Sequence, residues 1–219
     1  MLILTLIACT DGGGGTGDYA GIKMSDYFAF DGSRKSVFNN EDTTGFAWQL
    51  LVEKQTMTEI KDGREVSTIE YIRLDNGELL GSVSWSSVSS EAVQVHSYSI
   101  GATGEKLTFD PPVDITDGDD AMRIGDIIET DTTDSGGTSW HFTSTFVESV
   151  SECPSTAQDD FVKCVRFAID DGDGDAMAGP LFTGEFVFVA AWGTVYQTIP
   201  VAETEWELTD IEYIAEGDE

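Results

Sequence analysis

Positive charge is what this sequence lacks most. Its 219 residues hold 11 Lys and Arg against 41 Asp and Glu, a formal net charge of -30 at pH 7. Such a surface repels phosphate backbones and anionic headgroups, which argues against nucleic acid as a partner and against membrane binding driven by charge. Metal cations are the natural counter-species. Proteins in salty surroundings also carry solvated acidic faces, and we favour that plainer interpretation.

Histidine and long apolar runs are also scarce. Only His96 and His141 are able to act as a base near neutral pH, and neither has the spacing of a zinc ligand. There is no Gly-x-Ser-x-Gly motif, and the glycines at 12–15 are not followed by the lysine of a phosphate loop. No run approaches the roughly 20 apolar residues of a bilayer-spanning helix. The sequence therefore predicts a protein that is not an enzyme.

Helical periodicity is nearly absent, and the pattern that replaces it is that of strands and turns. Trp140, Phe142 and Phe146 alternate with His141 and other polar residues, which places one apolar face on a strand. Asn76-Gly77 is a hairpin signal. Residues 185–192 are apolar on both sides, as expected of a strand covered on both faces. Roughly ten to twelve strands follow from the spacing of the turns.

We therefore expect an all-β fold with a single antiparallel domain over residues 20–219. Periodicity alone leaves two architectures open, a sandwich or a curved sheet that closes as a half-barrel or barrel. Asp110-Pro111-Pro112 predicts a break near the middle of the chain, because proline cannot donate to a sheet ladder. The two halves would then form two sheets of one domain.

The first nine residues, Met1 to Cys9, are apolar and end in a cysteine preceded by the small residue Ala8. This pattern resembles the lipobox of bacterial lipoproteins, in which the cysteine becomes diacylated. Residues 10–19 then form a Gly-rich flexible tether. Because no Lys or Arg precedes Cys9, and a leader begins with a basic region, we expect the true start codon to lie upstream. Thr10 after the cysteine favours sorting to the outer membrane.

Cysteine number supports the same interpretation. The chain has 3 cysteines, and an exported protein rarely leaves one thiol spare. If Cys9 takes a lipid, Cys153 and Cys164 remain to form a disulfide across a loop between two strands. Closing a loop of this length contributes about 2–3 kcal/mol in the chain-entropy model. The alternative is a pair of buried thiols in a cytosolic protein.

Near the start of the predicted domain stands Asp26-Tyr27-Phe28-Ala29-Phe30-Asp31-Gly32. It is similar to the Tyr-Phe-Pro-Leu…Gly…Trp-type motif that opens the mature domain in a group of secreted bacterial lipoproteins of unknown function, with Ala29 in place of proline and Phe38 in place of tryptophan. The later motifs that resemble this group are Tyr71–Gly77, Phe109–Pro112, Arg123–Asp126, Phe161–Arg166 and Trp192–Val195. The resemblance implies an exported, β-rich lipoprotein and implies no activity.

One acidic loop is a candidate metal site. Carboxylates at Asp171, Asp173 and Asp175, separated by glycines, are able to wrap oxygens around Ca²⁺. The match to an EF-hand loop fails, because Ala176 stands in place of the glycine and Phe182 in place of the bidentate glutamate. A solvated acidic turn is the favoured interpretation, since many loops in this chain are equally acidic.

These observations predict a lipid-anchored protein of the cell envelope that acts as a ligand-binding, partner-binding or structural module. Two alternatives stay open. A concave sheet lined by tryptophans would carry an acyl chain or another apolar ligand, although tryptophans more often belong to the core. A calcium-stabilised adhesion module would use the acidic loop. An enzyme would need a cleft with polar groups converging on His96 or His141.

Overall fold

The protein is described here from a computed structural model. It describes residues 34–40, 48–61, 64–73, 77–86, 92–100, 105–117, 122–150, 164–172, 182–189, 193–199 and 204–213. The proposed signal and tether (1–19) lie outside these residues. The described residues contain no helix with the length and apolarity needed to cross a bilayer.

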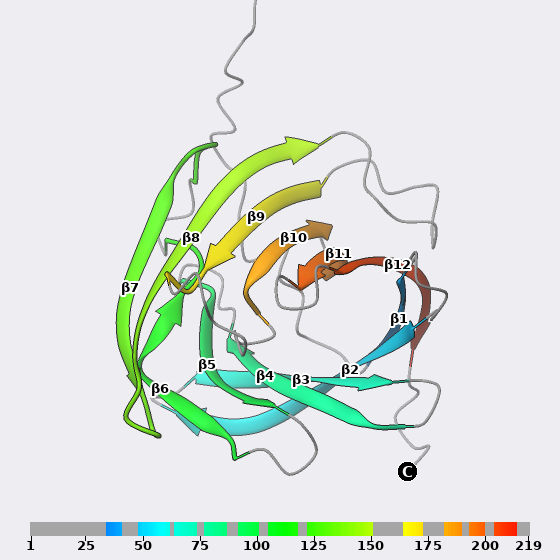
Figure 1. Ribbon diagram of the computed structural model, residues 1–219, viewed down its shortest axis with the longest axis horizontal. Coiled ribbons are helices and arrows are strands. Elements are labelled where there is room, and N and C mark those ends of the chain that lie inside the picture. Colours follow the sequence, from blue (N-terminus) through cyan, green and yellow to red (C-terminus); the bar gives the residue numbers. More distant parts are fainter. Residues whose placement is uncertain are drawn as a thin grey trace, which may run out of the picture.

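The described residues form one antiparallel sheet of twelve strands that closes into a barrel (Figure 1). Each strand is hydrogen-bonded to its neighbours in sequence, and β1 closes the ring by pairing with both β2 and β12. The strands are β1 (Arg34–Asn40), β2 (Trp48–Lys61), β3 (Arg64–Arg73), β4 (Leu79–Ser86), β5 (Gln94–Ile100), β6 (Leu107–Asp114), β7 (Ile127–Asp134), β8 (Ser139–Val150), β9 (Cys164–Asp170), β10 (Gly184–Val189), β11 (Gly193–Ile199) and β12 (Thr204–Tyr213). The predicted all-β antiparallel fold is confirmed. Of the two architectures that the sequence allowed, the sheet adopts the barrel and not the sandwich.

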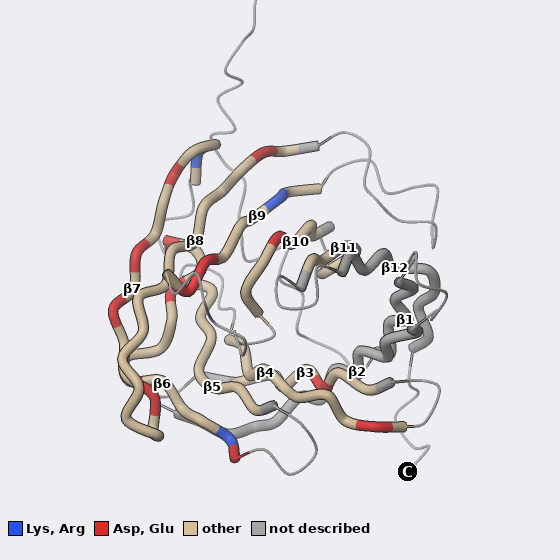
Figure 2. Tube along the Cα trace, in the orientation of Figure 1, with Lys and Arg blue, Asp and Glu red and all other residues tan. Residues whose placement is uncertain are grey.

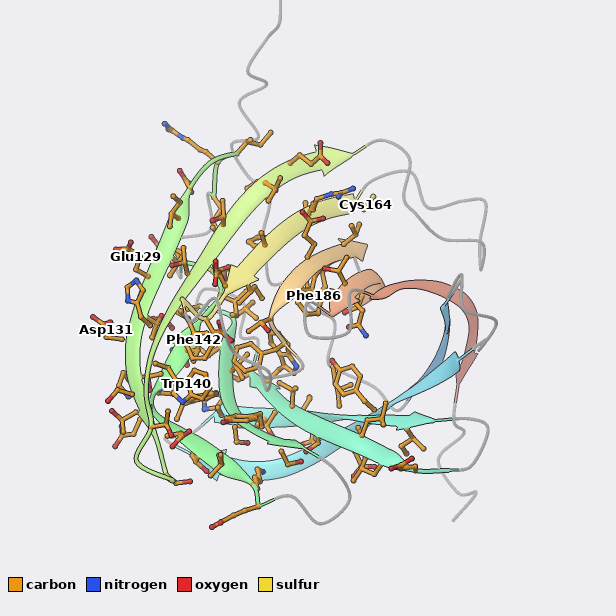
Figure 3. All side chains as sticks on the ribbon, in the orientation of Figure 1. Glu129, Asp131, Trp140, Phe142, Cys164 and Phe186 are labelled. Atoms are coloured by element: carbon orange, nitrogen blue, oxygen red, sulfur yellow. The ribbon has the colours of Figure 1, made fainter. Side chains whose placement is uncertain are left out.

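The two faces of the sheet differ sharply along β7. Thr130, Thr132 and Asp134 are buried, whereas the residues between them are exposed. The register pairs Thr130 with Phe142 and Thr132 with Trp140, so these side chains share the inner face. In Figure 3, Trp140 and Phe142 lie inside the curve of the strands, and Glu129 and Asp131 project from its outside. The alternation that predicted a one-sided apolar strand at β8 is therefore confirmed.

Aromatic rings from several strands pack against one another in the described part of the interior. The ring of Phe109 lies 5.3 Å from that of Tyr98, 5.5 Å from Phe142 and 5.8 Å from Phe182, measured between centroids. Phe182, which precedes β10, also packs edge-on against Trp85 at 6.1 Å. These edge-to-face and stacked arrangements are the favourable ones for aromatic pairs. Residues far apart in the chain thus meet in one core.

β10 confirms the expectation of a strand covered on both faces over its described length. Phe186, Val187 and Phe188 are consecutive, and none is more than 2% exposed. Because successive side chains of a strand point to opposite faces, burial of all three means that both faces are covered. This accounts for the unbroken apolar run in the sequence.

The prediction of a break at Asp110-Pro111-Pro112 is wrong. Both prolines lie inside β6, and the sheet continues past them. The β6–β7 pairing is limited to Phe109 with Asp134 and Asp110 with Thr133. Beyond it, side chains on the inner faces of β7 and β8 replace the ladder and hold the backbone of β6 and of Ile115, the residue that follows it. Their bonds run from Thr132 Oγ1 to the Pro111 carbonyl, from the Asp114 N–H to Thr130 Oγ1 (3.1 Å), and from Ser144 Oγ to the Ile115 carbonyl (2.8 Å).

These hydroxyls give a first testable expectation. Thr130→Val keeps the shape of the side chain but leaves the half-buried Asp114 N–H without this acceptor. We expect the free energy of unfolding to fall by about 1–3 kcal/mol, the usual cost of an unsatisfied buried donor. Thr133→Val, at an exposed position on the same strand, is the control and should change stability little. Equal urea midpoints for the two variants would contradict the role given to the hydroxyl.

Candidate functional site: the outer face of the β7–β8 hairpin

A histidine and an aspartate are paired across the outer face of β7 and β8. Asp131 lies directly opposite His141 in the register, and His141 Nδ1 is 2.8 Å from Asp131 Oδ1. Both side chains face solvent, with 51% of the His141 side chain and 89% of the Asp131 side chain exposed. The prediction that His141 lies on the polar face of its strand is confirmed. In Figure 2 acidic positions recur along β7, in keeping with the charge of the chain.

The surroundings of His141 raise its pKa above the usual 6.5. The hydrogen bond to Asp131 is the largest cause, and the negative charges of Asp131 and Glu129 act in the same direction, against a smaller opposing effect of desolvation. The imidazole therefore holds a proton at a higher pH than a free histidine does. The pair is exposed on the outer surface, and the charges that act on His141 are those of Asp131 and Glu129.

This pair gives a second testable expectation. A titration of His141 followed by NMR should give a pKa above 6.5, and Asp131→Asn should lower it towards that value. Because the folded pKa is raised, the stabilisation linked to this proton is present below pH 6.5 and is lost as the pH rises through the folded pKa. Glu129→Gln serves as the comparison and should produce a smaller change. A pKa that does not respond to Asp131→Asn would contradict the pairing.

The other histidine is placed quite differently. His96, on β5, is 5% exposed, and its Nε2 lies 2.7 Å from Ser86 Oγ on β4. Ser86 is 1% exposed, so a substrate has no access to this serine–histidine pair in the structure. One histidine is thus buried and the other lies on an exposed outer surface. The structure does not bring the two together around one cleft.

The acidic loop begins at the end of β9, beside His141. Asp170 Oδ1 accepts a hydrogen bond from the Gly172 N–H (2.8 Å), which closes a tight turn. Gly172 has φ +70°, and a Cβ there would lie 2.9 Å from the His141 carbonyl oxygen, so the turn requires glycine. Asp171 is half-buried, whereas Asp173 and Asp175 lie outside the described residues. Within the described ranges no cluster of three metal-ligating side chains occurs, and calcium binding stays a prediction.

The cysteines are only partly within the described residues. Cys164 opens β9 opposite Val150 at the end of β8, is fully buried, and is disulfide-bonded. Cys9 and Cys153 lie outside the described residues. The predicted position of Cys164, at the end of a loop that joins two strands, is therefore confirmed. Its pairing with Cys153 stays a prediction.

A buried carboxylate lies at the tip of the same hairpin. Asp134 is 4% exposed and accepts hydrogen bonds from Trp140 Nε1 (2.9 Å), the Thr138 N–H (3.0 Å) and the Tyr98 hydroxyl (3.4 Å). Burial alone raises the pKa of Asp134, but these bonds and one from the Gly136 N–H outweigh it and lower the pKa below 3.8. Burial and the same contact raise the pKa of Tyr98 to about 12.

Comparison with known protein families, curated proteins and solved structures finds no match.

Proposed function

We propose that the protein is a lipid-anchored module of the cell envelope, held by a diacylated Cys9 and a Gly-rich tether, that acts by binding rather than by catalysis. The proposal is supported by the order of the segments along the chain. An apolar run, a cysteine and a polar tether precede a closed barrel whose described strands begin at Arg34. A tether of this kind is useful only if a folded unit follows it. A net charge of -30 suits a unit held in water beside a membrane.

The placement of the histidines supports a role in binding. His96 is covered, and His141 stands on an outward-curving surface where no described group converges on it apart from Asp131 and Glu129. A general base needs a nucleophile or water held beside it in a site that excludes bulk solvent. Neither histidine has those surroundings in the described residues.

A disulfide between Cys153 and Cys164 belongs to the same proposal. Cys164 is disulfide-bonded, and the chain has 3 cysteines. If Cys9 carries the lipid, Cys153 is the only partner within the chain. The bond would tie the loop after Val150 to the first residue of β9, as structural disulfides do in oxidising compartments.

The experiment is metabolic labelling in a bacterial host, using the gene with its upstream codons and a fatty acid that carries an alkyne. Wild-type protein should take the label and sediment with membranes. Cys9→Ser should lose the label and move to the soluble fraction, whereas Cys153→Ser, the matched control, should keep the label. Equal labelling of all three proteins, or of none, would contradict the anchor.

A second function, carriage of an apolar ligand inside the barrel, is favoured by one observation. Gln197, on β11, lies opposite Phe186 and therefore shares its inner face; it is 1% exposed, and its Nε2 makes no hydrogen bond with any described residue. A buried donor without an acceptor costs about 1–3 kcal/mol, which a ligand carbonyl would offset. Native mass spectrometry of protein from the envelope decides: a retained acyl compound supports carriage, and a bare chain opposes it.

A further inference from the structure

The large hydrophobic side chains that are exposed in the described residues gather in one place. They are Ile124 (51% exposed), Ile127 (57%) and Val147 (36%). Ile127 pairs with Thr145, two residues before Val147 on the outer face of β8, and Ile124 belongs to the turn that leads into β7. Single exposed aliphatic residues are ordinary, but three at the same end of one hairpin form a patch.

The segment that presents these side chains is firmly held. Asp126 Oδ2 accepts a hydrogen bond from the Arg123 N–H (2.6 Å), and the Asp126 N–H donates to the Arg123 carbonyl (2.9 Å). The Gly125 N–H donates to the Phe146 carbonyl, and the Phe146 N–H donates to the Asp126 carbonyl. Met122, just before the turn, is buried in the core. These bonds hold the backbone on both sides of Ile124. Its side chain is therefore exposed from an ordered turn.

An arginine immediately precedes Ile124 in the turn that leads into β7. Arg123 is exposed, and its guanidinium forms no ion pair with any described residue. Arg166, by contrast, lies 3.1 Å from both Glu148 and Glu185. The chain has a net charge of -30, so most of its cations have acids available to pair with. An exposed arginine that forms no ion pair with a described residue, next to the exposed Ile124, is therefore unusual. We call Arg123, Ile124, Ile127 and Val147 the Arg123 patch.

We propose that the Arg123 patch rests on the surface of the bilayer that carries the Cys9 anchor, an inference that depends on the proposed function. Aliphatic side chains near an arginine suit the lipid interface. The aliphatic side chains would enter the region between headgroups and acyl chains, and the guanidinium would bind a lipid phosphate. Zwitterionic lipid is the appropriate surface, because anionic headgroups repel the rest of the chain.

The anchor makes a patch of this small size sufficient. A tether holds the barrel at a high effective concentration near the bilayer, so a contact too weak to bind alone still selects one orientation. A flexible Gly-rich tether leaves the orientation of the barrel open, so the patch would set which side faces the membrane.

The test uses the full acylated chain on phosphatidylcholine vesicles with bromine at defined depths in the acyl chains. Ile124→Trp places a fluorophore in the patch, and Thr133→Trp is the matched control. Thr133 is exposed on the same face of β7, six residues from Ile127 and so about 20 Å away. After subtraction of the wild-type emission, bromines near the headgroups should quench the Ile124→Trp fluorophore strongly, and bromines near the chain ends should quench it less. The fluorophore of the Thr133→Trp control should stay bright with both.

Further variants separate the causes. Adding Ile127→Asp or Arg123→Glu to Ile124→Trp should bring its quenching down to the level of the control. Equal quenching at the two positions, or none at either, in a protein that stays on the vesicles overturns the inference and leaves the anchor standing. A chain that is not acylated at Cys9 overturns both. A concentration-dependent dimer that Ile127→Asp abolishes would assign the patch to a second copy of the chain and overturn the membrane contact.

Discussion

Replacing Phe109 with alanine is expected to lower the free energy of unfolding by about 3–5 kcal/mol, the range for removing a fully buried ring. The ring is fully buried and contacts Tyr98 from β5, Phe142 from β8 and Phe182 from the segment before β10. Its removal leaves a cavity at the point where these three segments meet, and packed rings collapse into such a space only partly. Urea denaturation, followed by tryptophan fluorescence, measures the change.

The control for this experiment is Ile127→Ala. Ile127 is 57% exposed, so its truncation should change stability by no more than about 0.5 kcal/mol. Phe109→Leu should fall between the two, since leucine fills part of the cavity. If Phe109→Ala costs no more than Ile127→Ala, the aromatic cluster does not hold the strands together.

Replacing Asp134 with alanine should lower the free energy of unfolding by about 2–4 kcal/mol at neutral pH, because buried donors lose a charged acceptor. The Trp140 Nε1–H and the Tyr98 hydroxyl both point at this carboxylate. Tyr98→Phe removes one donor and leaves the carboxylate bound by the others, so it should cost about 1 kcal/mol. Asp131→Ala is the matched control: it removes an exposed carboxylate from the same strand and should leave the urea midpoint nearly unchanged.

The effect of Asp134 should depend on pH with a definite sign. Its pKa in the folded chain lies below the ordinary 3.8, so the folded state favours the carboxylate. The stabilisation is fully present above pH 3.8 and is lost as the pH falls through the folded pKa. Wild type and Asp134→Ala should therefore converge in stability under acid and differ most near neutral pH. A difference that grows on acidification would show that the site binds the protonated acid instead.

The strands could be predicted from the sequence because their signal is local. The alternation around Trp140 and Phe142 and the apolar run of β10 describe how each strand is covered, and both expectations are confirmed. Closure into a barrel could not be predicted, because it depends on pairs such as Arg34 with Tyr213, which come from opposite ends of the chain. No window of the sequence records that contact.

The misplaced break at Pro111 has a similar cause. Prolines in a strand normally indicate an edge or an end, since they donate nothing to the ladder. Here Thr132 and Ser144, which lie 21 and 29 residues further along from the carbonyls they bind, supply bonds to the same stretch of backbone. Local propensity is overruled by side chains from two other strands, and that compensation is visible only once the strands are in place.

The site on the outer face of β7 and β8 could also be predicted only in part. That His141 faces outward followed from its apolar neighbours, whereas its pairing with Asp131 depends on the register set by the turn after Asp134. From the sequence alone, Asp134 looks like any other acidic residue beside a Gly-rich turn. Its burial is caused by Tyr98 and Trp140, and Tyr98 comes from a distant strand.

The central claim, that Cys9 carries a lipid anchor, is tested most directly by identifying the disulfide partner of Cys164. Cys164 is disulfide-bonded and the chain has two other cysteines, so peptide mapping of unreduced, envelope-derived protein by mass spectrometry has a clear outcome. A Cys153–Cys164 cross-linked peptide, together with an N-terminal peptide that begins at a diacylated Cys9, is the result that the account predicts. A Cys9–Cys164 cross-link, or an unmodified Cys9 thiol, would contradict it.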